Sequence, residues 1–494
     1  ATNSSRRLDG LDEVLLDDTE RPLEPALAAV LPRGPAPLEL AAAGREAAAA
    51  DSVVRVATIG YHTTLVLELV AQWEEMPLQG GPAVEVVAHI LEPSATTAEE
   101  VRRSSMCKWF RDGDLCAWDA RLLDLNARHV VRGRLPLAKL PSPLFEDPEA
   151  FLADFAAAFG RASGATDASA RSGLDSRIDA ADVYLCTEPA LLCGALGRAF
   201  PDKPIVAYFA NPLCSYVPAA SAQRWLAEFA ALAAPGAHRP GLLAVASTRF
   251  LAEQIRFQTG VRTLAARPLA LYLGAASGFP RHRPGEVVVL RAPSLFWGAA
   301  CVLNALAQLN APELARARAS NGNIGMPGPT FTASEELKDG ATEVFASFEA
   351  VVIFPYDVSQ MRLYEAYAMG LPTLVPARAS LPSYMYRGMT TIDDFNHTLP
   401  VPLQAQFVGD REDGPHFKHS PFNRDSWEAV ALWTELTHWA RLPHLLHCDG
   451  AMDMLLRLAR DDLRPLSAGM RRQQERDIVR GLRFWSEAFR RLLQ

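Results

Sequence analysis

The segment from Val351 to Pro376 constrains the fold of this 494-residue chain more than any other. It begins with an apolar, β-branched run, Val351 to Phe354, which is too short for a helix and is typical of a buried parallel strand. A polar turn and a helical stretch follow, and Gly370 and Pro372 end that helix before the next strand, 373–375. Such a strand–helix–strand unit belongs to a parallel sheet and places ligands outside the carboxyl end of its strands.

Two acidic residues lie where this unit would bind a ligand. Asp357 is in the turn, and Glu365 follows inside the helix, about one turn from its start. Free N–H groups at the helix start, residues 359–363, and the positive end of the helix dipole suit a phosphate or diphosphate. Arg362 would add positive charge, and Glu365 would accept hydrogen bonds from a ribose or sugar hydroxyl. The same pattern also fits an ordinary α/β crossover whose two acids are only capping and solvated.

The segment resembles the donor-binding signature of the GT-B glycosyltransferases, in particular the retaining group known as glycosyltransferase group 1 or family 4-like. That signature is an acid, seven residues and a glutamate, followed by Ala-x-Ala-x-Gly-x-Pro. Here it consists of Asp357 and Glu365, followed by Ala366, Ala368, Gly370 and Pro372. The resemblance is close over 351–376 and extends loosely to the order of strands in both halves. It departs at Asp357, where glutamate is more usual and reaches further.

The resemblance implies a site for a nucleotide-sugar. In that family the residue matching Glu365 holds the ribose of the donor, and the one matching Asp357 faces the sugar. The backbone between them binds phosphate, so the remaining donor-binding positions are Ser359, Gln360, Met361, Arg362 and Leu363. The fold that it implies is α/β and of the GT-B type, with two Rossmann-like domains whose parallel sheets face a cleft, and a helical C-terminal tail.

The order of strand and helix patterns along the chain agrees with this fold class. Apolar strands alternate with helices of about 10–12 residues, which indicates parallel sheets with right-handed crossovers. We expect a stem or peripheral extension at 1–51, a Rossmann-like acceptor domain at 52–275 and a nucleotide-sugar donor domain at 280–400. A helical tail, 401–494, would pack back across the domains. Residues 310–340 appear rich in loops, without a regular dinucleotide fingerprint.

His62 and Arg291 are the candidate catalytic residues besides Asp357. His62 follows the first convincing strand, where a neutral imidazole can take a proton from an acceptor hydroxyl; inverting GT-B enzymes use a histidine in this loop. Arg291 ends the first strand of the second half and resembles the arginine that retaining enzymes direct at the donor diphosphate. Those enzymes usually carry a lysine five residues later, where this chain has Phe296. His62 is equally compatible with a surface or capping role.

Other polar residues indicate a catalytic or binding role less specifically. Glu188 follows a strand and either caps a helix or faces the cleft, and the loop 211–216 lies at another strand's carboxyl end. Asp112-Gly113-Asp114 has the form of the metal site of GT-A glycosyltransferases, but the apolar strand that should precede it is missing. His444, His447 and Cys448 have helical spacing that a metal could use, although a packed helix explains it better. We predict no metal and no cofactor.

The net charge and the cysteines limit which binding partners and which cellular compartment are expected. The net charge of −8 gives no reason to expect nucleic acid, and no apolar run is long enough to span a membrane. The seven cysteines contain no Cys-x-x-Cys pair. Cys186 and Cys193 lie in apolar segments and are expected to be simply buried, whereas Cys107 and Cys116 would pair in an oxidising compartment. Two glycosylation sequons begin at Asn3 and Asn396 and favour the secretory pathway over the cytoplasm.

These observations leave two hypotheses. In the first, the chain is a metal-independent glycosyltransferase of the retaining type that moves a sugar from a nucleotide-sugar to a glycan, glycoprotein or small-molecule hydroxyl. In the second, it is a non-catalytic GT-B-like protein that binds a glycan or a partner, which Phe296 in place of lysine favours. A sugar epimerase on the same fold is a lesser third.

Overall fold

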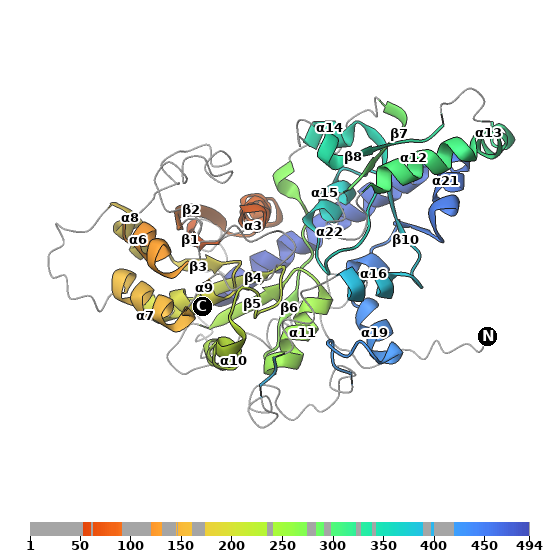
Figure 1. Cartoon of the computed structure of the whole chain (residues 1–494). Coiled ribbons are helices and arrows are strands. Elements are labelled where there is room, and N and C mark those ends of the chain that lie inside the picture. Colours follow the sequence, from red (N-terminus) through yellow and green to blue (C-terminus); the bar gives the residue numbers. More distant parts are fainter. Residues whose placement is uncertain are drawn as a thin grey trace, which may run out of the picture. The chain divides into compact units, whose positions relative to one another are not determined.

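The computed structural model divides the chain into two compact units. It describes residues 53–60, 63–90, 120–130, 145, 147–160, 173–234, 241–273, 283–290, 298–322, 328–337, 342–388, 397–399 and 419–493. Unit 1 comprises 1–267, 394–423 and 482–494, and unit 2 comprises 268–393 and 424–481. The residues predicted as one tail, 401–494, are thus divided between both units. Figure 1 shows the elements of each unit.

Unit 1 is built on a parallel sheet of six strands in the order β2-β1-β3-β4-β5-β6. The central strands consist of apolar residues that are buried on both faces, as expected for a parallel sheet covered by helices. The strands are β1 (Val53–Ile59), β2 (Ala83–Ile90), β3 (Val183–Cys186), β4 (Ile205–Phe209), β5 (Leu242–Ala246) and β6 (Leu264–Ala265).

The helices of unit 1 begin and end at residues suited to those positions. In α11 (Arg249–Thr259), the Thr248 side chain accepts a hydrogen bond from the N–H of Leu251 at 3.1 Å. Gly260 ends α11 with φ at 79°, a conformation that favours glycine. The other helices are α3 (Thr63–Glu75), α6 (Ala120–His129), α7 (Pro148–Phe159), α8 (Gly173–Ala180), α9 (Leu191–Ala199) and α10 (Ala219–Ala233), with η1 (Met76–Gln79) after α3.

Unit 2 has its own parallel sheet, of five strands in the order β11-β10-β9-β7-β8. The strands are β7 (Arg283–Val289), β8 (Thr330–Ala333), β9 (Phe348–Val352), β10 (Thr373–Pro376) and β11 (Leu446–Cys448). Helices α12 and α21 pack against this sheet around a common apolar core. The helices are α12 (Ala299–Leu309), α13 (Ala311–Ser320), α14 (Thr342–Ala346), α15 (Met361–Ala368), α16 (Leu381–Gly388), α19 (Trp427–Thr434), α20 (His438–Arg441), α21 (Ala451–Arg460) and α22 (Arg464–Leu492), with 3₁₀ turns η5 (Leu271–Leu273) and η7 (Ser334–Glu336).

The predicted fold class, α/β with two parallel sheets and a largely helical C-terminal region, is confirmed, and two local expectations are wrong. Residues 310–340, which the sequence analysis describes as rich in loops, contain α13 and β8. The 444–448 segment does not form a helix, because Leu446–Cys448 pairs with β10 as β11. Among the described residues, no helix is long and apolar enough to cross a membrane.

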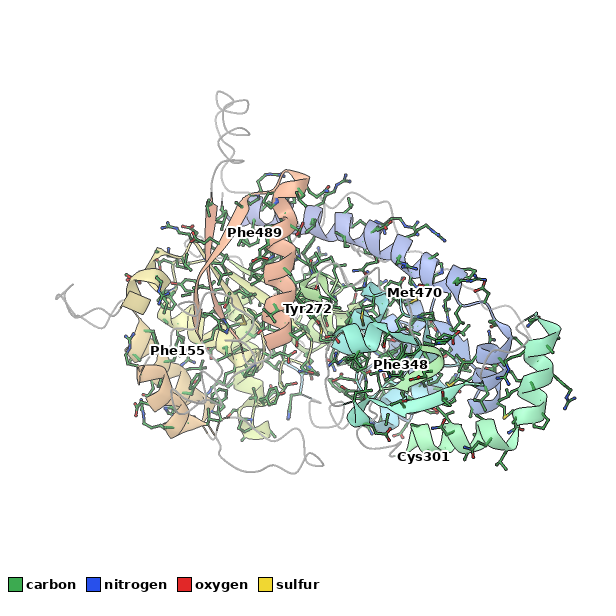
Figure 2. All side chains as sticks on the ribbon, turned by 90° about the horizontal axis from the view of Figure 1, so that it is seen from above. Phe155, Tyr272, Cys301, Phe348, Met470 and Phe489 are labelled. Carbon is green, nitrogen blue, oxygen red and sulfur yellow. A yellow bond between two sulfur atoms is a disulfide. The ribbon has the colours of Figure 1, made fainter. Side chains whose placement is uncertain are left out.

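The end of α22 completes the core of unit 1. Trp485 and Phe489 contact the Trp73 ring of α3 edge-on, with centroids 5.7 Å and 5.0 Å away. The Trp485 Nε1–H donates to the side-chain oxygen of Gln72 at 2.9 Å, and Gln72 in turn donates to Glu68 at 2.5 Å. All of these side chains are buried. Figure 2 labels Phe489 beside α3.

Cys186 and Cys193 are not merely buried, as the sequence analysis expects, but form a disulfide. The bond connects the end of β3 to the first turn of α9 across seven positions of sequence. The apolar context of both residues predicts burial and says nothing about pairing, which depends on how the intervening turn brings the two Cα atoms to 5.4 Å. Cys107 and Cys116 lie outside the described residues.

Replacing Cys193 by alanine should lower the free energy of unfolding by about 2 kcal/mol, because a loop this short loses only modest entropy when it is closed. Urea unfolding with and without reductant measures the effect. Reductant should destabilise the wild-type protein by a similar amount and leave the Cys193→Ala protein unchanged. A wild-type protein that does not respond to reductant under unfolding conditions would contradict the assignment.

Candidate functional site

The organising segment lies at the point where the strand order of unit 2 reverses. The chain leaves β7 toward β8 on one side and returns to β9 on the other, so that β7 and β9 are neighbours. In open parallel sheets, ligands bind outside the carboxyl ends of such a pair of strands. Residues 353–360 follow β9 directly at this edge, and α15 begins at Met361. Asp357 and Glu365 therefore occupy the region in which this architecture binds ligands.

Three side chains hold the loop before α15. Gln360 is 4% exposed, and with its amide oxygen turned inward it accepts from the backbone N–H groups of Tyr356 at 2.7 Å and Asp357 at 3.3 Å. The Asp357 carboxylate accepts from the N–H of Val358 at 2.6 Å. From α20, the Trp439 indole N–H donates to the carbonyl oxygen of Asp357 at 2.9 Å. The loop conformation is thus fixed by its own residues and by a helix far away in sequence.

A second buried contact fixes α15 itself. The Tyr364 hydroxyl lies 2.7 Å from Nδ1 of His438 and 3.5 Å from the Ser359 hydroxyl. Both Tyr364 and His438 are buried, and their rings meet edge-on. Leu363 is buried in the core, whereas Met361 is half-buried. These contacts hold the first turn of α15 at the carboxyl edge of the sheet. Of its leading N–H groups, that of Leu363 donates to the carbonyl oxygen of Gln360 at 2.9 Å, which leaves those of Met361 and Arg362 as the candidates for ligand binding.

Glu365 is engaged through both of its carboxylate oxygens. The Tyr272 hydroxyl, from η5, donates to Oε1 at 2.6 Å. The Arg362 guanidinium donates to Oε2 at 2.6 Å, and its carbon atom lies 5.0 Å from the centre of the Phe345 ring. Glu365 is 7% exposed, so its charge is stabilised by these two donors rather than by bulk water. Figure 2 labels Tyr272.

The arrangement can bind a polar ligand that carries hydroxyl groups and negative charge. Glu365 accepts one of its two hydrogen bonds from a hydroxyl group, that of Tyr272, so a ligand hydroxyl can make the same kind of bond there. The start of α15 offers N–H groups and a positive dipole end to an anion. Arg362 does not stand as a free cation, since Glu365 neutralises it. Its expected contribution to phosphate binding is therefore smaller than the sequence suggests.

Sequence reasoning identifies part of this site. The segment 357–365 consists of a loop and the start of α15, as its strand–helix–strand pattern predicts. It does not identify Tyr272, His438 and Trp439, which reach the segment from other parts of unit 2 and carry no motif. Tyr272 falls within the predicted acceptor domain, 52–275, whereas the structure places it in unit 2. His62 and Arg291, the other two catalytic candidates, lie outside the described residues.

Unit 1 has a corresponding reversal of strand order between β1 and β3, and Glu188 lies there. Its carboxylate accepts hydrogen bonds from the N–H of Ala210, at 2.9 Å, and from the Asn211 side-chain amide. Glu188 is 3% exposed, and burial raises the pKa of its carboxyl group to about 7, although these hydrogen bonds oppose the rise. The sequence analysis leaves Glu188 open between a cap and a cleft residue. The structure shows that it joins the ends of β3 and β4.

The described residues contain no group of histidine, cysteine and acidic side chains that could hold a metal ion. His447, one of three residues with metal-like spacing, bonds through Nδ1 to the carbonyl oxygen of Pro376 at 3.1 Å. Cys448 is buried in the core of the unit 2 sheet. Residues 112–114, which resemble a GT-A metal site, lie outside the described residues, as does Asn396 of the second sequon.

Comparison with known proteins adds one structural likeness. No protein-family model and no curated protein matches the chain. Among solved structures, the crystal structure of the glycosyltransferase SnogD from Streptomyces nogalater is similar at 13% sequence identity. The match covers 78% of this chain and 95% of that one, with a TM-score of 0.30. Similarity at this level carries no argument about function, which depends on the site itself.

Proposed function

We propose that the chain is a glycosyltransferase of the GT-B type that moves a sugar from a nucleotide-sugar to a hydroxyl acceptor. One observation carries the proposal: the acid–seven–glutamate segment, Asp357 to Glu365, follows β9 at the reversal of strand order in a parallel sheet. The residue pattern and the place in the fold are independent of one another. Both indicate a nucleotide-diphosphate site.

In this proposal each part of the segment binds a different part of the donor. Glu365 accepts hydrogen bonds from the ribose hydroxyls, and the N–H groups at the start of α15 bind the diphosphate. Asp357 orients the sugar. Negative charge builds on the diphosphate as it leaves. The start of α15 and Arg291 stabilise this charge and so accelerate the reaction without a bound metal. The sugar is transferred with retention; if the reaction inverts, His62 is the general base.

When no ligand is bound, the Tyr272 hydroxyl occupies the proposed ribose site by donating to Glu365. A carboxylate with few partners would be costly to bury, and the hydroxyl of Tyr272 occupies the oxygen where a ribose hydroxyl would bind. The donor then replaces one O–H···O⁻ hydrogen bond by another of the same kind. Binding is limited by displacement of η5 rather than by desolvation of the carboxylate.

The acceptor and the compartment belong to the same proposal. The acceptor is a glycan, a glycoprotein or a small molecule, and unit 1 binds it near the reversal between β1 and β3. The disulfide between Cys186 and Cys193 supports a place in the secretory pathway, because such bonds persist in oxidising compartments. A cytoplasmic location is the alternative.

Glu365→Ala should abolish stabilisation by the donor nucleotide. We expect one of UDP, GDP, ADP or CMP, or the corresponding nucleotide-sugars, to raise the midpoint of thermal unfolding of the wild-type protein by mass action. Loss of a hydrogen bond to a charged group costs about 1.5–3 kcal/mol, which weakens binding about 10- to 100-fold. The midpoint shift of the mutant should disappear at the same nucleotide concentration.

Two further variants control this experiment. Glu475→Ala removes an exposed acid from α22 and should leave the nucleotide response unchanged. Tyr272→Phe removes the competing hydroxyl and should strengthen nucleotide binding. No shift with any nucleotide would reject the donor site. If the protein binds a nucleotide but transfers sugar from none of the nucleotide-sugars tested, the non-catalytic GT-B-like protein is favoured instead. Phe296 in place of lysine also favours that alternative.

A further inference from the structure

A polar cavity opens at the other end of the unit 2 sheet from the candidate donor site. Its volume is about 490 Å³. Gly285 and Glu349 line it near the amino ends of β7 and β9, whereas residues 353–360 follow the carboxyl end of β9. The remaining wall comes from the end of α13, with Arg318 and Asn321, and from the turn 460–464 between α21 and α22.

Each acidic group of this wall already has a partner. Glu349 accepts the backbone N–H of Gly285. Asp462 accepts two hydrogen bonds of 2.9 Å from the Arg464 guanidinium, one at each carboxylate oxygen. Asp461 lies 3.9 Å from the guanidinium of Arg457. Asp461 and Asp462 are therefore paired with arginines, Arg457 outside the wall and Arg464 within it, whereas Glu349 is bound by a backbone N–H.

The two remaining arginines of the wall differ in their partners. Among the described residues, Nη1 of Arg318 has no hydrogen-bond acceptor, whereas the exposed guanidinium of Arg460 interacts electrostatically with Asp453 and makes no hydrogen bond. Nη1 of Arg318 is fully buried, and a buried N–H donor without an acceptor is energetically unfavourable. The sequence leaves room for this group at Gly328, where an added Cβ would lie 3.0 Å from Nη1.

The elements that carry the two arginines are fixed to each other. Helix α13 packs along α21, as Figure 1 shows, with Leu314 and Ala317 in the core. The Asn321 side chain donates to the carbonyl oxygen of Arg460 at 2.9 Å and so joins the ends of both helices. Arg318 and Arg460 thus face the same cavity from a rigid frame, which lowers the entropic cost of binding a ligand between them.

We propose that this cavity binds an oxyanion of the phosphate type, with Arg318 and Arg460 as its ligands. A guanidinium group presents parallel N–H donors that match two oxygens of a phosphoryl group. The bound anion supplies the acceptor that Nη1 of Arg318 lacks and accepts hydrogen bonds from the guanidinium of Arg460. The ligand is either free inorganic phosphate or the phosphoryl group of a larger molecule such as a sugar phosphate. This inference does not depend on the function proposed above.

Titration calorimetry and thermal unfolding with inorganic phosphate, at constant ionic strength, test the proposal. Phosphate should bind the wild-type protein and raise its unfolding midpoint, whereas chloride should not. Arg318→Gln and Arg460→Gln should each weaken phosphate binding about tenfold or more. Gly328→Ala should also weaken it, because the added methyl group displaces the Arg318 guanidinium. Glucose 6-phosphate in parallel distinguishes the two sources: tighter binding than phosphate identifies a phosphorylated sugar, and weaker binding identifies the free ion.

Arg316→Gln is the matched control, because Arg316 is an exposed arginine on the same helix whose Nε bonds to the carbonyl oxygen of Pro312. It should leave phosphate binding unchanged. Phosphate that binds Arg318→Gln and Gly328→Ala as tightly as the wild-type protein occupies another site, such as the start of α15, and overturns the proposal. Equal weakening by Arg316→Gln, or no binding to the wild-type protein, overturns it too. If Arg318→Gln does not fold, Arg460→Gln and Gly328→Ala decide the question.

Discussion

Replacing Trp485 by alanine is expected to lower the free energy of unfolding of unit 1 by about 4 kcal/mol. The side chain is fully buried, and its removal leaves a cavity beside Trp73, Tyr208 and Phe484, whose rings all contact it. The change also takes away the donor that satisfies the side-chain oxygen of Gln72. An oxygen left buried without a donor adds about 1–3 kcal/mol to the cost of the cavity.

Urea unfolding followed by circular dichroism measures this effect. Trp427→Ala is the matched control, because Trp427 is 65% exposed and its loss should change stability by less than about 0.5 kcal/mol. Trp485→Phe separates the two contributions, since it keeps most of the buried apolar surface and loses the N–H donor. If Trp485→Ala unfolded at the same urea concentration as Trp427→Ala, the end of α22 would not be part of the unit 1 core.

Glu188→Gln is expected to stabilise the protein above pH 7, by up to about 3 kcal/mol. The pKa of Glu188 rises from an ordinary value of 4.5 to about 7 in the folded protein. Between these values the folded state binds more protons than the unfolded state, so stability falls as pH rises through this window. Above pH 7 the cost of burying the charged carboxylate is complete. Glutamine avoids that cost while its oxygen still accepts the Ala210 N–H.

His89 produces the opposite dependence on pH. Burial lowers the pKa of its imidazole from 6.5 to about 4, so the unfolded state binds more protons between these values and stability rises with pH. From about pH 4.5 to 6.5 the effects of His89 and Glu188 on stability have opposite signs. In the Glu188→Gln protein the His89 effect is no longer opposed by Glu188, so stability should rise more steeply with pH than in the wild type.

Thermal unfolding from pH 4 to 9 checks both signs. Glu85→Gln, an exposed acid on β2, serves as the control and should follow the wild-type curve. A Glu188→Gln protein that is less stable than the wild type at pH 8 would show that the carboxylate is worth more as an acceptor for Ala210 and Asn211 than it costs to bury. That result would make Glu188 a structural anion of unit 1.

The sequence predicts the elements that are set by local pattern. Apolar runs such as 205–209 become buried strands, and Thr248 and Gly260 delimit their helix because capping depends on neighbouring residues. Elements set by distant contacts are missed. His444, His447 and Cys448 have helical spacing, yet Leu446–Cys448 forms a strand because it pairs with β10. Strand β8 has only four residues, too few to show a strand pattern in the sequence.

The candidate site follows the same division. Asp357 and Glu365 are found because one motif contains both. Tyr272, His438 and Trp439 become visible only when the fold brings η5 and α20 to that motif. The state of Glu365 could not be predicted either, since it depends on a tyrosine 93 positions away. Local sequence thus identifies the candidate carboxylates, and tertiary structure decides which donors each of them binds.

The contact between Trp73 and Trp485 has a consequence for how the protein is made. The indole N–H of Trp485 meets Gln72 across 413 positions of sequence. At the usual rate of translation, about 5–20 residues per second, α3 leaves the ribosome roughly 20–80 seconds before its partner. During that interval the apolar face of α3 has no native cover from α22. Nascent chains of unit 1 are therefore expected to need a chaperone until residues 482–493 emerge.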